Sequence, residues 1–214
     1  MRAVEDSTCP QWPVAFFLSG HGSSAAAPRK ADPMPTHVPA EAHGDERGAL
    51  LAFLEAQRGG LRRSVLGLTD EQATRKPSAS ELSLAGLLKH VAEVERDWLE
   101  TAQQVPHTVQ RDMSNYHLGF QLEESQTVAS VLAEWAETAR ATEDFIRSQP
   151  DLNGTFPLPE APWFPPKAEQ SMRWLLLHLI EEIARHAGHA DILRESLDGK
   201  TAFTLVDEER AAQG

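Results

Sequence analysis

The sequence predicts an all-α protein whose core is a four-helix bundle. Four long segments carry apolar residues at helical intervals, and none of the stretches between them alternates as a strand would. The chain has 214 residues, of which 41% are apolar, and about 170 remain for one core after a Pro- and Ala-rich beginning. No apolar run approaches the roughly 20 residues of a membrane span, so we expect no membrane partner.

We divide the chain into an N-terminal extension over residues 1–43, the bundle over 44–199 and a C-terminal tail over 200–214. Between Ser23 and Ala42 the residues are mainly Ala, Pro, Ser and His. Such residues bury too little apolar surface to offset the entropy of ordering, so we expect the extension to be disordered. The apolar run from Trp12 to Leu18 has only about seven residues, and Arg2 is outweighed by Glu5 and Asp6 where a secretory signal requires positive charge, so we expect no secretory signal. Met34 is an alternative start.

Charge and cysteine content restrict the partners and the compartment. The 20 Lys and Arg residues are outnumbered by 32 Asp and Glu residues, which gives a formal net charge of −12. Because no basic stripe gathers along the chain, we expect no nucleic-acid partner. The single cysteine, Cys9, lies in the predicted extension, which excludes an intrachain disulfide and a thiolate-rich zinc site. This use of cysteine fits a cytoplasmic protein.

The first helix is expected to begin after Asp45, which is a good N-cap residue. Its apolar positions recur at helical intervals through Leu50, Phe53, Leu54, Leu61, Val65 and Leu68. Gly59 and Gly60 interrupt this pattern and should weaken or bend the helix. The stretch from Thr69 to Gln72 then has the form of a capping box, and Pro77 ends the short turn that this box begins.

The second helix is predicted from about Ser83 to Gln104. One face of it is apolar and comprises Leu84, Leu87, Leu88, Val91, Val94 and Trp98. His90 falls among these residues, one turn from Leu87 and one turn from Val94. Residues 105–126 are polar and irregular, and Tyr116, His117 and Phe120 are among their ring-bearing residues. We expect a long connection there that includes one helical turn.

The third helix should begin near Thr127 and stop before Pro150, with Val131, Leu132, Trp135, Ala139, Thr142, Phe145 and Ile146 repeating on one face. Residues 150–170 hold prolines at positions 150, 157, 159, 162, 165 and 166, which favours a stiff loop without regular structure. Trp163 and Phe164 in this loop must pack against other parts of the protein. The fourth helix is predicted over about residues 169–197, with Gly199 as its left-handed cap, and a polar tail follows.

The fourth helix carries three polar residues in a seam that is otherwise apolar. Steps of three and four residues connect Met172, Leu175, Leu179, Glu182, His186, His189 and Leu193, so these side chains share one stripe. Burying a carboxylate or an imidazole without a partner costs on the order of several kcal/mol. A metal ion that binds such groups is the simplest explanation for their position.

A ligand set for this ion follows from the spacing and the predicted bundle. Glu182 and His186 are four residues apart, so their side chains lie one above the other and can converge on one ion. Bundles assemble metal sites from facing helices, and under this assumed topology His90 supplies the third ligand. Two imidazoles and one carboxylate leave coordination positions open, as in catalytic sites. We expect a divalent metal ion, with Zn²⁺ as the leading choice.

The alternative is that each polar residue is satisfied by a protein neighbour or by water. The pairs to consider are His90 with Glu95 or a backbone carbonyl, Glu182 with Arg185 or Arg173, and His186 with water. For any single histidine this explanation is the better one, because histidines are often only hydrogen-bonded. The three residues together favour the metal.

Two more histidines lie on the fourth helix. His178 precedes Glu182 by four residues, which suggests a ladder of His178, Glu182 and His186 as another ligand set. The ends of this ladder are about 12 Å apart, too far to share one ion through bonds near 2 Å. We therefore expect His178 to pack or to support a ligand. His189 would replace a ligand, orient one by hydrogen bonding, or act on the substrate as a catalytic residue.

No other chemistry has a comparable signal in this sequence. The chain has no Gly-x-Ser-x-Gly motif and no Gly-rich phosphate loop. Trp98, Trp135 and Trp174 occur at helical spacing on core faces, and we interpret them as packing residues.

A set of short stretches carries a family resemblance. They are Asp45–Arg47, Leu50–Leu54, Gly67–Gln72, Leu82–Glu95, Ile192–Glu195 and the motif Glu-x-x-x-Arg-His-x-Gly-His-Ala-Asp from Glu181 to Asp191. Together they resemble the actinobacterial branch of the DinB-like superfamily, over about residues 44–199. Many DinB-like proteins carry His-x-x-x-His on the last helix, whereas this chain has Glu182 and His186 there, as relatives of maleylpyruvate isomerase do.

The resemblance implies a fold, a site and a class of activity. The superfamily includes mycothiol-dependent maleylpyruvate isomerase and thiol S-transferases, and its members are four-helix bundles, often dimeric, that hold a divalent metal through three residues. By resemblance, these ligands are His90, Glu182 and His186. We expect a thiol-dependent transferase or isomerase that acts on a small electrophile with a thiol such as mycothiol. The implied partners are a small-molecule substrate and a second copy in a homodimer.

A second hypothesis belongs to another class of protein. The chain would be a non-catalytic, dimeric metal-binding or stress-associated module. In the enzyme hypothesis, the polar 105–126 segment and the Pro-rich 150–170 loop shape the substrate entrance, because loops on a rigid bundle commonly do so.

Overall fold

A computed structural model describes residues 45–161 and 164–213. The predicted N-terminal extension, which includes Cys9 and Met34, lies outside the described residues, as does Trp163. Within the described residues, no helix has the length and apolar character needed to cross a membrane.

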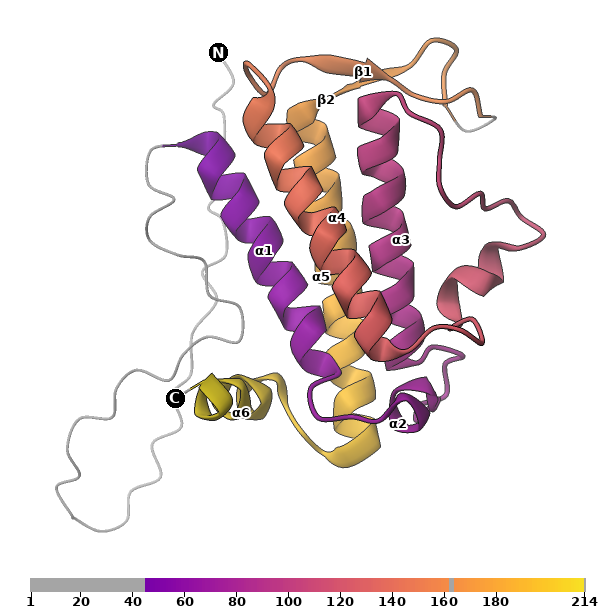
Figure 1. The fold of residues 1–214 in the computed structure, drawn as a ribbon, viewed down its shortest axis with the longest axis vertical. Helices are drawn as coiled ribbons and strands as arrows, with labels where there is room; N and C mark the ends of the chain where they lie inside the picture. Colours follow the sequence, from indigo (N-terminus) through magenta and orange to yellow (C-terminus); the bar gives the residue numbers. More distant parts are fainter. Residues whose placement is uncertain (1–44, 162–163, 214) are drawn as a thin grey trace, which may run out of the picture. The chain divides into compact units, whose positions relative to one another are not determined.

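Four long helices form the body of the described chain, as the sequence predicts (Figure 1). They are α1 (Glu46–Ser64), α3 (Leu84–Gln103), α4 (Val128–Ser148) and α5 (Met172–Asp198). The shorter elements are α2 (Asp70–Thr74), the 3-10 helix η2 (Tyr116–Phe120), β1 (Thr155–Pro157), β2 (Glu169–Ser171) and α6 (Ala202–Gln213). The all-α fold class is therefore confirmed.

Each long helix begins at a polar side chain that accepts a hydrogen bond from the backbone of its first turn. The four capping residues are Asp45, Ser83, Thr127 and Ser171. Each cap satisfies one N–H group that the helix leaves unpaired, and such a cap is worth about 1 kcal/mol. Thr69 and Gln72 form the predicted capping box of α2, and Gly199 ends α5 in the left-handed region at φ 78°.

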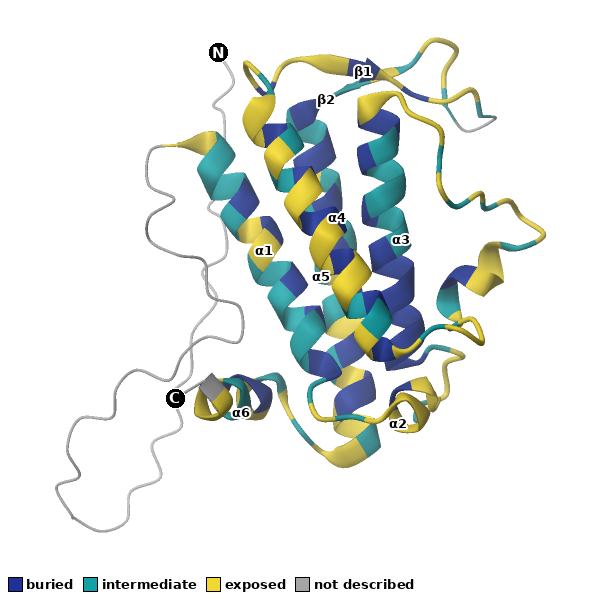
Figure 2. Cartoon of the chain, in the orientation of Figure 1, coloured by how far each residue is buried: buried dark blue, intermediate teal, exposed yellow. Residues whose placement is uncertain are grey.

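The apolar faces of the long helices meet in one core. Figure 2 shows the buried residues gathered on the inward sides of α1, α3 and α5. Fully buried leucines include Leu54, Leu61, Leu87, Leu88, Leu175 and Leu179. Helix α5 packs mainly on α1, and α3 packs on α4 and α5. Helix α1 stays helical through Gly59 and Gly60, and a Cβ at Gly60 would lie 3.7 Å from the Ala187 Cβ of α5.

The Pro-rich 150–170 loop contains more regular structure than expected. Its ends pair as two short antiparallel strands, with Thr155 opposite Ser171 and Pro157 opposite Glu169. Phe156 of β1 is buried in the core, which anchors the pair. The prediction of a loop without regular structure was wrong at these ends, because a strand of three residues is too short for periodicity to show.

The predicted polar tail also forms a helix. Residues 202–213 make up α6, which contacts α1. Leu205 and Val206 are buried, and Glu209 pairs with Arg63 of α1 at 3.3 Å. Two adjacent apolar residues are too few to show helical periodicity in the sequence. The burial of these two residues becomes evident only when α6 packs on α1.

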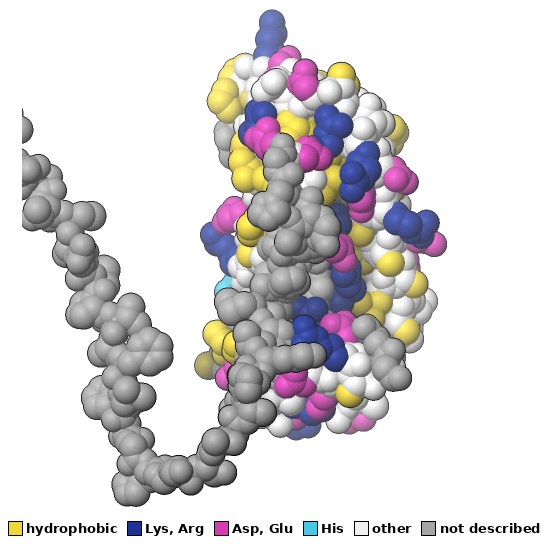
Figure 3. Space-filling view, turned by 90° about the vertical axis from the view of Figure 1, so that its left-hand side faces the viewer, with side chains coloured by type: hydrophobic (Ala, Val, Ile, Leu, Met, Phe, Trp, Pro, Cys, Tyr) yellow, Lys and Arg dark blue, Asp and Glu magenta, His cyan; other side chains and the backbone are white. Residues whose placement is uncertain are grey.

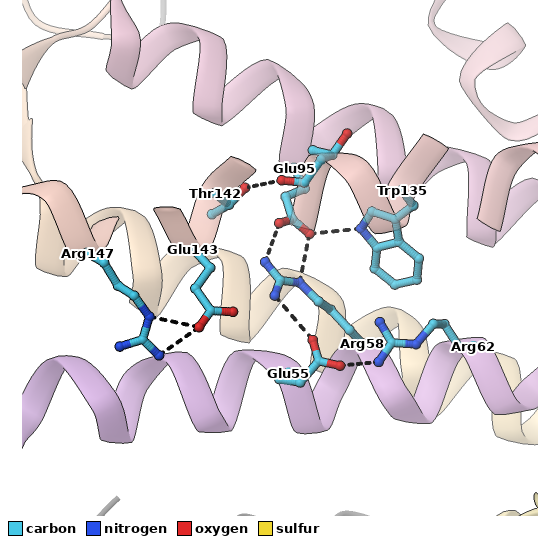
Figure 4. A network of polar contacts seen from close by, with 9 residues as sticks. Glu55, Arg58, Arg62, Glu95, Trp135, Thr142, Glu143 and Arg147 are labelled. Atoms are coloured by element: carbon cyan, nitrogen blue, oxygen red, sulfur yellow. Dashed lines mark hydrogen bonds and ion pairs between the residues drawn. The ribbon is translucent and has the colours of Figure 1, made fainter. Parts of the chain in front are cut away.

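A buried ion pair joins α1 to α3. Arg58 and Glu95 are 2% and 0% exposed; Arg58 Nε donates to Glu95 Oε2 at 3.1 Å, and Nη2 donates to Oε1. Trp135 Nε1 of α4 donates to the same Oε2 at 2.8 Å. Glu55 accepts a bond from Arg58 and also pairs with Arg62, as Figure 4 shows. The network therefore ties three helices to one another.

Ion pairs on the surface of the described chain have a smaller role. In Figure 3, basic and acidic side chains are interspersed on the face in view rather than gathered by sign. One surface pair joins Arg173 of α5 to Glu46 of α1 at 2.6 Å. Water solvates and salt screens such exposed pairs, so they contribute little to stability. The buried pair of Arg58 and Glu95, in contrast, is shielded from both water and salt, because its side chains are 2% and 0% exposed.

We expect the substitution Glu95→Gln to lower the free energy of unfolding by about 3–5 kcal/mol, because it leaves the buried Arg58 guanidinium without a counter-charge. Chemical denaturation measures this change. The matched control is Glu143→Gln, which removes the exposed partner of Arg147 and should change stability far less. Equal effects of the two substitutions would contradict the importance assigned to the buried pair.

Candidate metal centre

Three candidate ligands come together between α3 and α5. His90 lies on α3, and Glu182 and His186 lie one turn apart on α5. Nε2 of His90 is 3.3 Å from Oε1 of Glu182, and Nε2 of His186 is 3.2 Å from the same oxygen. The three possible ligand atoms all lie within 4.8 Å of one another. The structure thus brings His90 to the two residues of α5 across the core.

The spacing of these atoms suits a small divalent cation. Ligand atoms about 2.0–2.2 Å from a tetrahedral ion lie roughly 3.3 Å apart. The two distances from the Glu182 oxygen, 3.3 and 3.2 Å, are close to this value, and the two imidazole nitrogens lie within 4.8 Å of each other. Two imidazoles and a carboxylate are also a donor set typical of Zn²⁺ and related ions. Both the spacing and the chemistry of the donors therefore fit a bound metal.

The centre is shielded from solvent without being closed. The exposed fractions of the side chains are 7% for His90, 11% for His186 and 21% for Glu182. Among the described residues, the cluster contains only these three metal-ligating side chains. Three protein ligands leave room in the coordination sphere for a small molecule.

The neighbours that might otherwise satisfy these groups are paired elsewhere. The pairs are Glu95 with Arg58, Arg185 with Glu181 at 2.9 Å, and Arg173 with Glu46 at 2.6 Å. Within the described chain, the hydrogen bonds of Glu182 come from His90 and His186 rather than from a cation. Glu95, Arg185 and Arg173 are therefore not the partners of the cluster, and its three side chains are hydrogen-bonded to one another instead.

Hydrogen bonding to the two imidazoles lowers the pKa of Glu182 far below its usual range. The bond from His186 has the largest effect, the bond from His90 adds to it, and burial acts in the opposite direction. The Glu182 carboxylate is therefore ionised throughout the neutral and mildly acidic range, where it is available as an anionic ligand.

The 3-10 helix η2 fixes the ring of His90. Phe120 stacks on this ring, with the two centroids 4.1 Å apart and the planes inclined by 18°. Helix η2 approaches α3 closely at Gly86, where a Cβ would lie only 2.2 Å from the Phe120 carbonyl oxygen. The buried Lys89 Nζ donates to the carbonyls of Leu118 and Gln121 at 3.1 and 2.8 Å. Gly86 and Lys89, which precede His90 on α3, therefore hold η2 in the position from which Phe120 stacks on the His90 ring.

The rest of the connection between α3 and α4 is tied to the same helix. Arg111 makes two bonds to Glu93, at 3.0 and 2.7 Å. His107 lies between Asp97 and Thr101, with Nδ1 2.6 Å from the carboxylate and Nε2 3.0 Å from the hydroxyl. These contacts were not among the predictions from the sequence, although acidic residues four apart on α3 and basic residues in the connection are a usable signal.

A pocket of about 350 Å³ lies at the other end of α3. Its walls include Thr101 and His107, together with residues of β1 and the stretch that follows. Thr101 is separated from His90 by about 16 Å along the helix, at 1.5 Å per residue. This pocket is therefore distinct from the candidate metal centre.

His189 is exposed and lies beside a candidate ligand. Its Nδ1 is 3.5 Å from Nδ1 of His186. His186 uses its other nitrogen, Nε2, toward Glu182. His189 is therefore placed to orient the His186 ring through a weak hydrogen bond, in the way that outer residues orient metal-binding histidines.

His178 packs in an aromatic cluster one turn from Glu182. Its ring is stacked on Trp174 at 4.8 Å and meets Trp98 edge-on at 4.8 Å. Burial lowers the pKa of His178, and the negative charges of Glu182 and Glu181 offset only part of this shift. The structure places His178 as a packing residue, one of the two positions expected for it.

The fold and the cluster define a class of protein: a helical bundle with two histidines and one glutamate gathered between facing helices. The chain matches the family model for mycothiol S-transferase over residues 49–199. That match covers most of the chain, and the protein therefore belongs to this DinB-like family. No curated protein matches the chain.

We expect the purified protein to bind a divalent metal and His186→Ala to lose most of it, because the substitution removes one of three ligands. Elemental analysis after metal loading and desalting measures this loss. The control is His178→Phe, which keeps an aromatic ring against Trp174 and should retain the metal. Failure of the wild type to bind metal, or full binding by His186→Ala, would refute the assignment.

We expect Gly86→Ala to displace η2 and to weaken metal binding by about 10- to 100-fold, the range typical of residues that orient a ligand. The reason is the clash of the new Cβ with the Phe120 carbonyl. Competition with a chelator measures the affinity, and limited proteolysis detects release of the connection. Gly60→Ala is the control, because its Cβ meets only an ordinary contact. Unchanged affinity in Gly86→Ala would show that η2 does not support His90.

Proposed function

We propose that the protein is a metal-dependent mycothiol S-transferase, which joins the sulfur of a low-molecular-weight thiol to a small electrophile. One observation carries this proposal: two imidazoles and a carboxylate converge, with coordination positions left open, in a member of the mycothiol S-transferase family. We favour a transferase over an isomerase because the matching family is one of S-transferases.

Zn²⁺ is the metal in this proposal, because it binds nitrogen and oxygen ligands at tetrahedral spacing and does not require thiolates. When bound, it supplies a positive charge that lowers the pKa of a coordinated thiol and holds the thiolate. His90 and His186 would bind through Nε2, which must be unprotonated in both rings. Glu182 contributes the negative charge of the ligand set.

The reaction requires a bond exchange at carbon and the release of a proton. The thiolate sulfur attacks an electrophilic carbon, an S–C bond forms, and the leaving group departs with the electrons of its former bond. The thiol proton is lost before this step. In this proposal His189 passes that proton to solvent, and its exposure and its distance of 3.5 Å from His186 support the role.

Membership of the family also implies a small-molecule substrate. In this proposal the substrate is the electrophile that receives the thiol sulfur. The homodimer and the cytoplasmic location stay predictions from the sequence. Light scattering of the purified protein tests the first, and fractionation of cells that express the full chain tests the second.

We expect the zinc-loaded protein to conjugate mycothiol to monobromobimane faster than the two react without protein, with a strong chelator abolishing this acceleration. Glu182→Gln should lower kcat/KM by more than about 100-fold, beyond the effect typical of residues outside the ligand set. The matched control is Glu181→Gln, which changes the adjacent, exposed residue that pairs with Arg185. Product formation is followed by mass spectrometry.

The same experiment separates the two functional hypotheses. Zinc binding and thermal stabilisation by zinc, without conjugation of any tested thiol, would favour the non-catalytic metal-binding module. Acceleration of conjugation above the uncatalysed rate that survives metal removal would contradict the metal-dependent mechanism.

A further inference from the structure

Tyr116 is the one tyrosine of the chain, and it lies beside the candidate metal centre. Its ring meets the ring of His90 edge-on, with centroids 6.2 Å apart and planes inclined by 76°. It also meets Phe120 edge-on, at 5.8 Å and 64°. The residue is nevertheless 52% exposed, so one part of the ring is packed and another part faces solvent.

The position of Tyr116 is fixed by the packing of η2 against α3. Tyr116 is the first residue of η2 and Phe120 is the last. The close approach of Phe120 to Gly86 and the two bonds from Lys89 hold the later part of the turn on the helix. The ring of Tyr116 is therefore held beside the ring of His90 by a turn that is anchored independently of its own side chain.

The hydroxyl of Tyr116 distinguishes it from the other rings around His90. The ring neighbours of His90 in the described chain are Tyr116, Phe120 and His186. Phe120 has no polar atom, and His186 directs Nε2 toward Glu182. Within residues 45–161 and 164–213, the contacts of Tyr116 are ring contacts, and its hydroxyl has no hydrogen-bond partner.

We propose that Tyr116 is a substrate-contacting residue whose hydroxyl donates a hydrogen bond to the thiolate sulfur held at the His90, Glu182 and His186 centre. This inference rests on the proposed function. A phenol O–H is a good donor, and hydrogen bonds to charged acceptors are stronger than those between neutral groups. The donor stabilises the thiolate relative to the thiol, so Tyr116 favours the reactive form of the substrate.

A single tyrosine makes this contact directly observable. Protein grown with ring carbon-13 tyrosine gives a tyrosine signal in the NMR spectrum that belongs to Tyr116 alone. We expect mycothiol to shift this signal in the zinc-loaded protein and to leave it unmoved in the metal-free protein. S-methyl mycothiol, which cannot form a thiolate, should produce little shift even with zinc present.

The substitution Tyr116→Phe provides the second measurement. It keeps the ring that packs against His90 and Phe120 and removes only the hydroxyl. Zinc content should therefore be unchanged, while kcat/KM for mycothiol conjugation should fall about 10- to 100-fold, as expected for the loss of a hydrogen bond to a charged group. The matched control is His117→Gln, on the exposed neighbour in the same turn, which should leave kcat/KM unchanged.

The outcomes distinguish this inference from the proposed function. If the wild type conjugates mycothiol but the tyrosine signal does not move and Tyr116→Phe is fully active, the role of Tyr116 is refuted and the S-transferase remains. If the zinc-loaded wild type neither binds nor conjugates the thiol, the proposed function fails, and the role of Tyr116 fails with it. A zinc-dependent shift together with reduced kcat/KM in Tyr116→Phe supports both.

Discussion

The buried ion pair of Arg58 and Glu95 sets the rotation of α3, and the candidate metal centre depends on that rotation. Glu95 follows His90 by five residues, which places the two side chains about 140° apart around the helix. Because Arg58 of α1 and Trp135 of α4 hold Glu95, His90 is directed to the other side of α3, toward α5. A charged contact in the packed part of the bundle thus positions a ligand that it does not touch.

The interior contains two kinds of polar group. Buried cations are paired with acceptors. Arg58 binds a carboxylate, Lys89 binds mainly backbone carbonyls, and Arg194 binds both the Asp198 carboxylate and the carbonyls of Ser64 and Leu66. Such groups are satisfied by their protein partners, which is the condition for burying a charge. The cluster between α3 and α5 is different, because its carboxylate meets two imidazoles and no Arg or Lys among the described residues. A divalent cation would replace these two hydrogen bonds once both Nε2 atoms have lost their protons.

Part of the site follows from helical geometry alone. The four-residue spacing on one helix is sufficient to place Glu182 above His186, and the length of three turns is sufficient to separate His178 from that pair. The assignment of His90 as the third ligand also required knowing which helix faces α5, and this depends on how the bundle is assembled. The turn that stacks Phe120 on His90 had only indirect signals in the sequence, namely Gly86 and Lys89 on an otherwise apolar helix. Neither Gly86 nor Lys89 indicates by itself which segment of the chain packs beside it.

The sequence by itself determined the four long helices and their starting points, because apolar periodicity and N-capping side chains act within a few residues of the chain. Only the tertiary structure decided the pairing of β1 with β2, the helix at residues 202–213 and the course of the connection over α3. Each of these depends on a contact between residues far apart in sequence, such as Phe156 in the core or Leu205 in α6, which packs on α1. Such contacts gain their stability from surfaces that exist only when the bundle has formed.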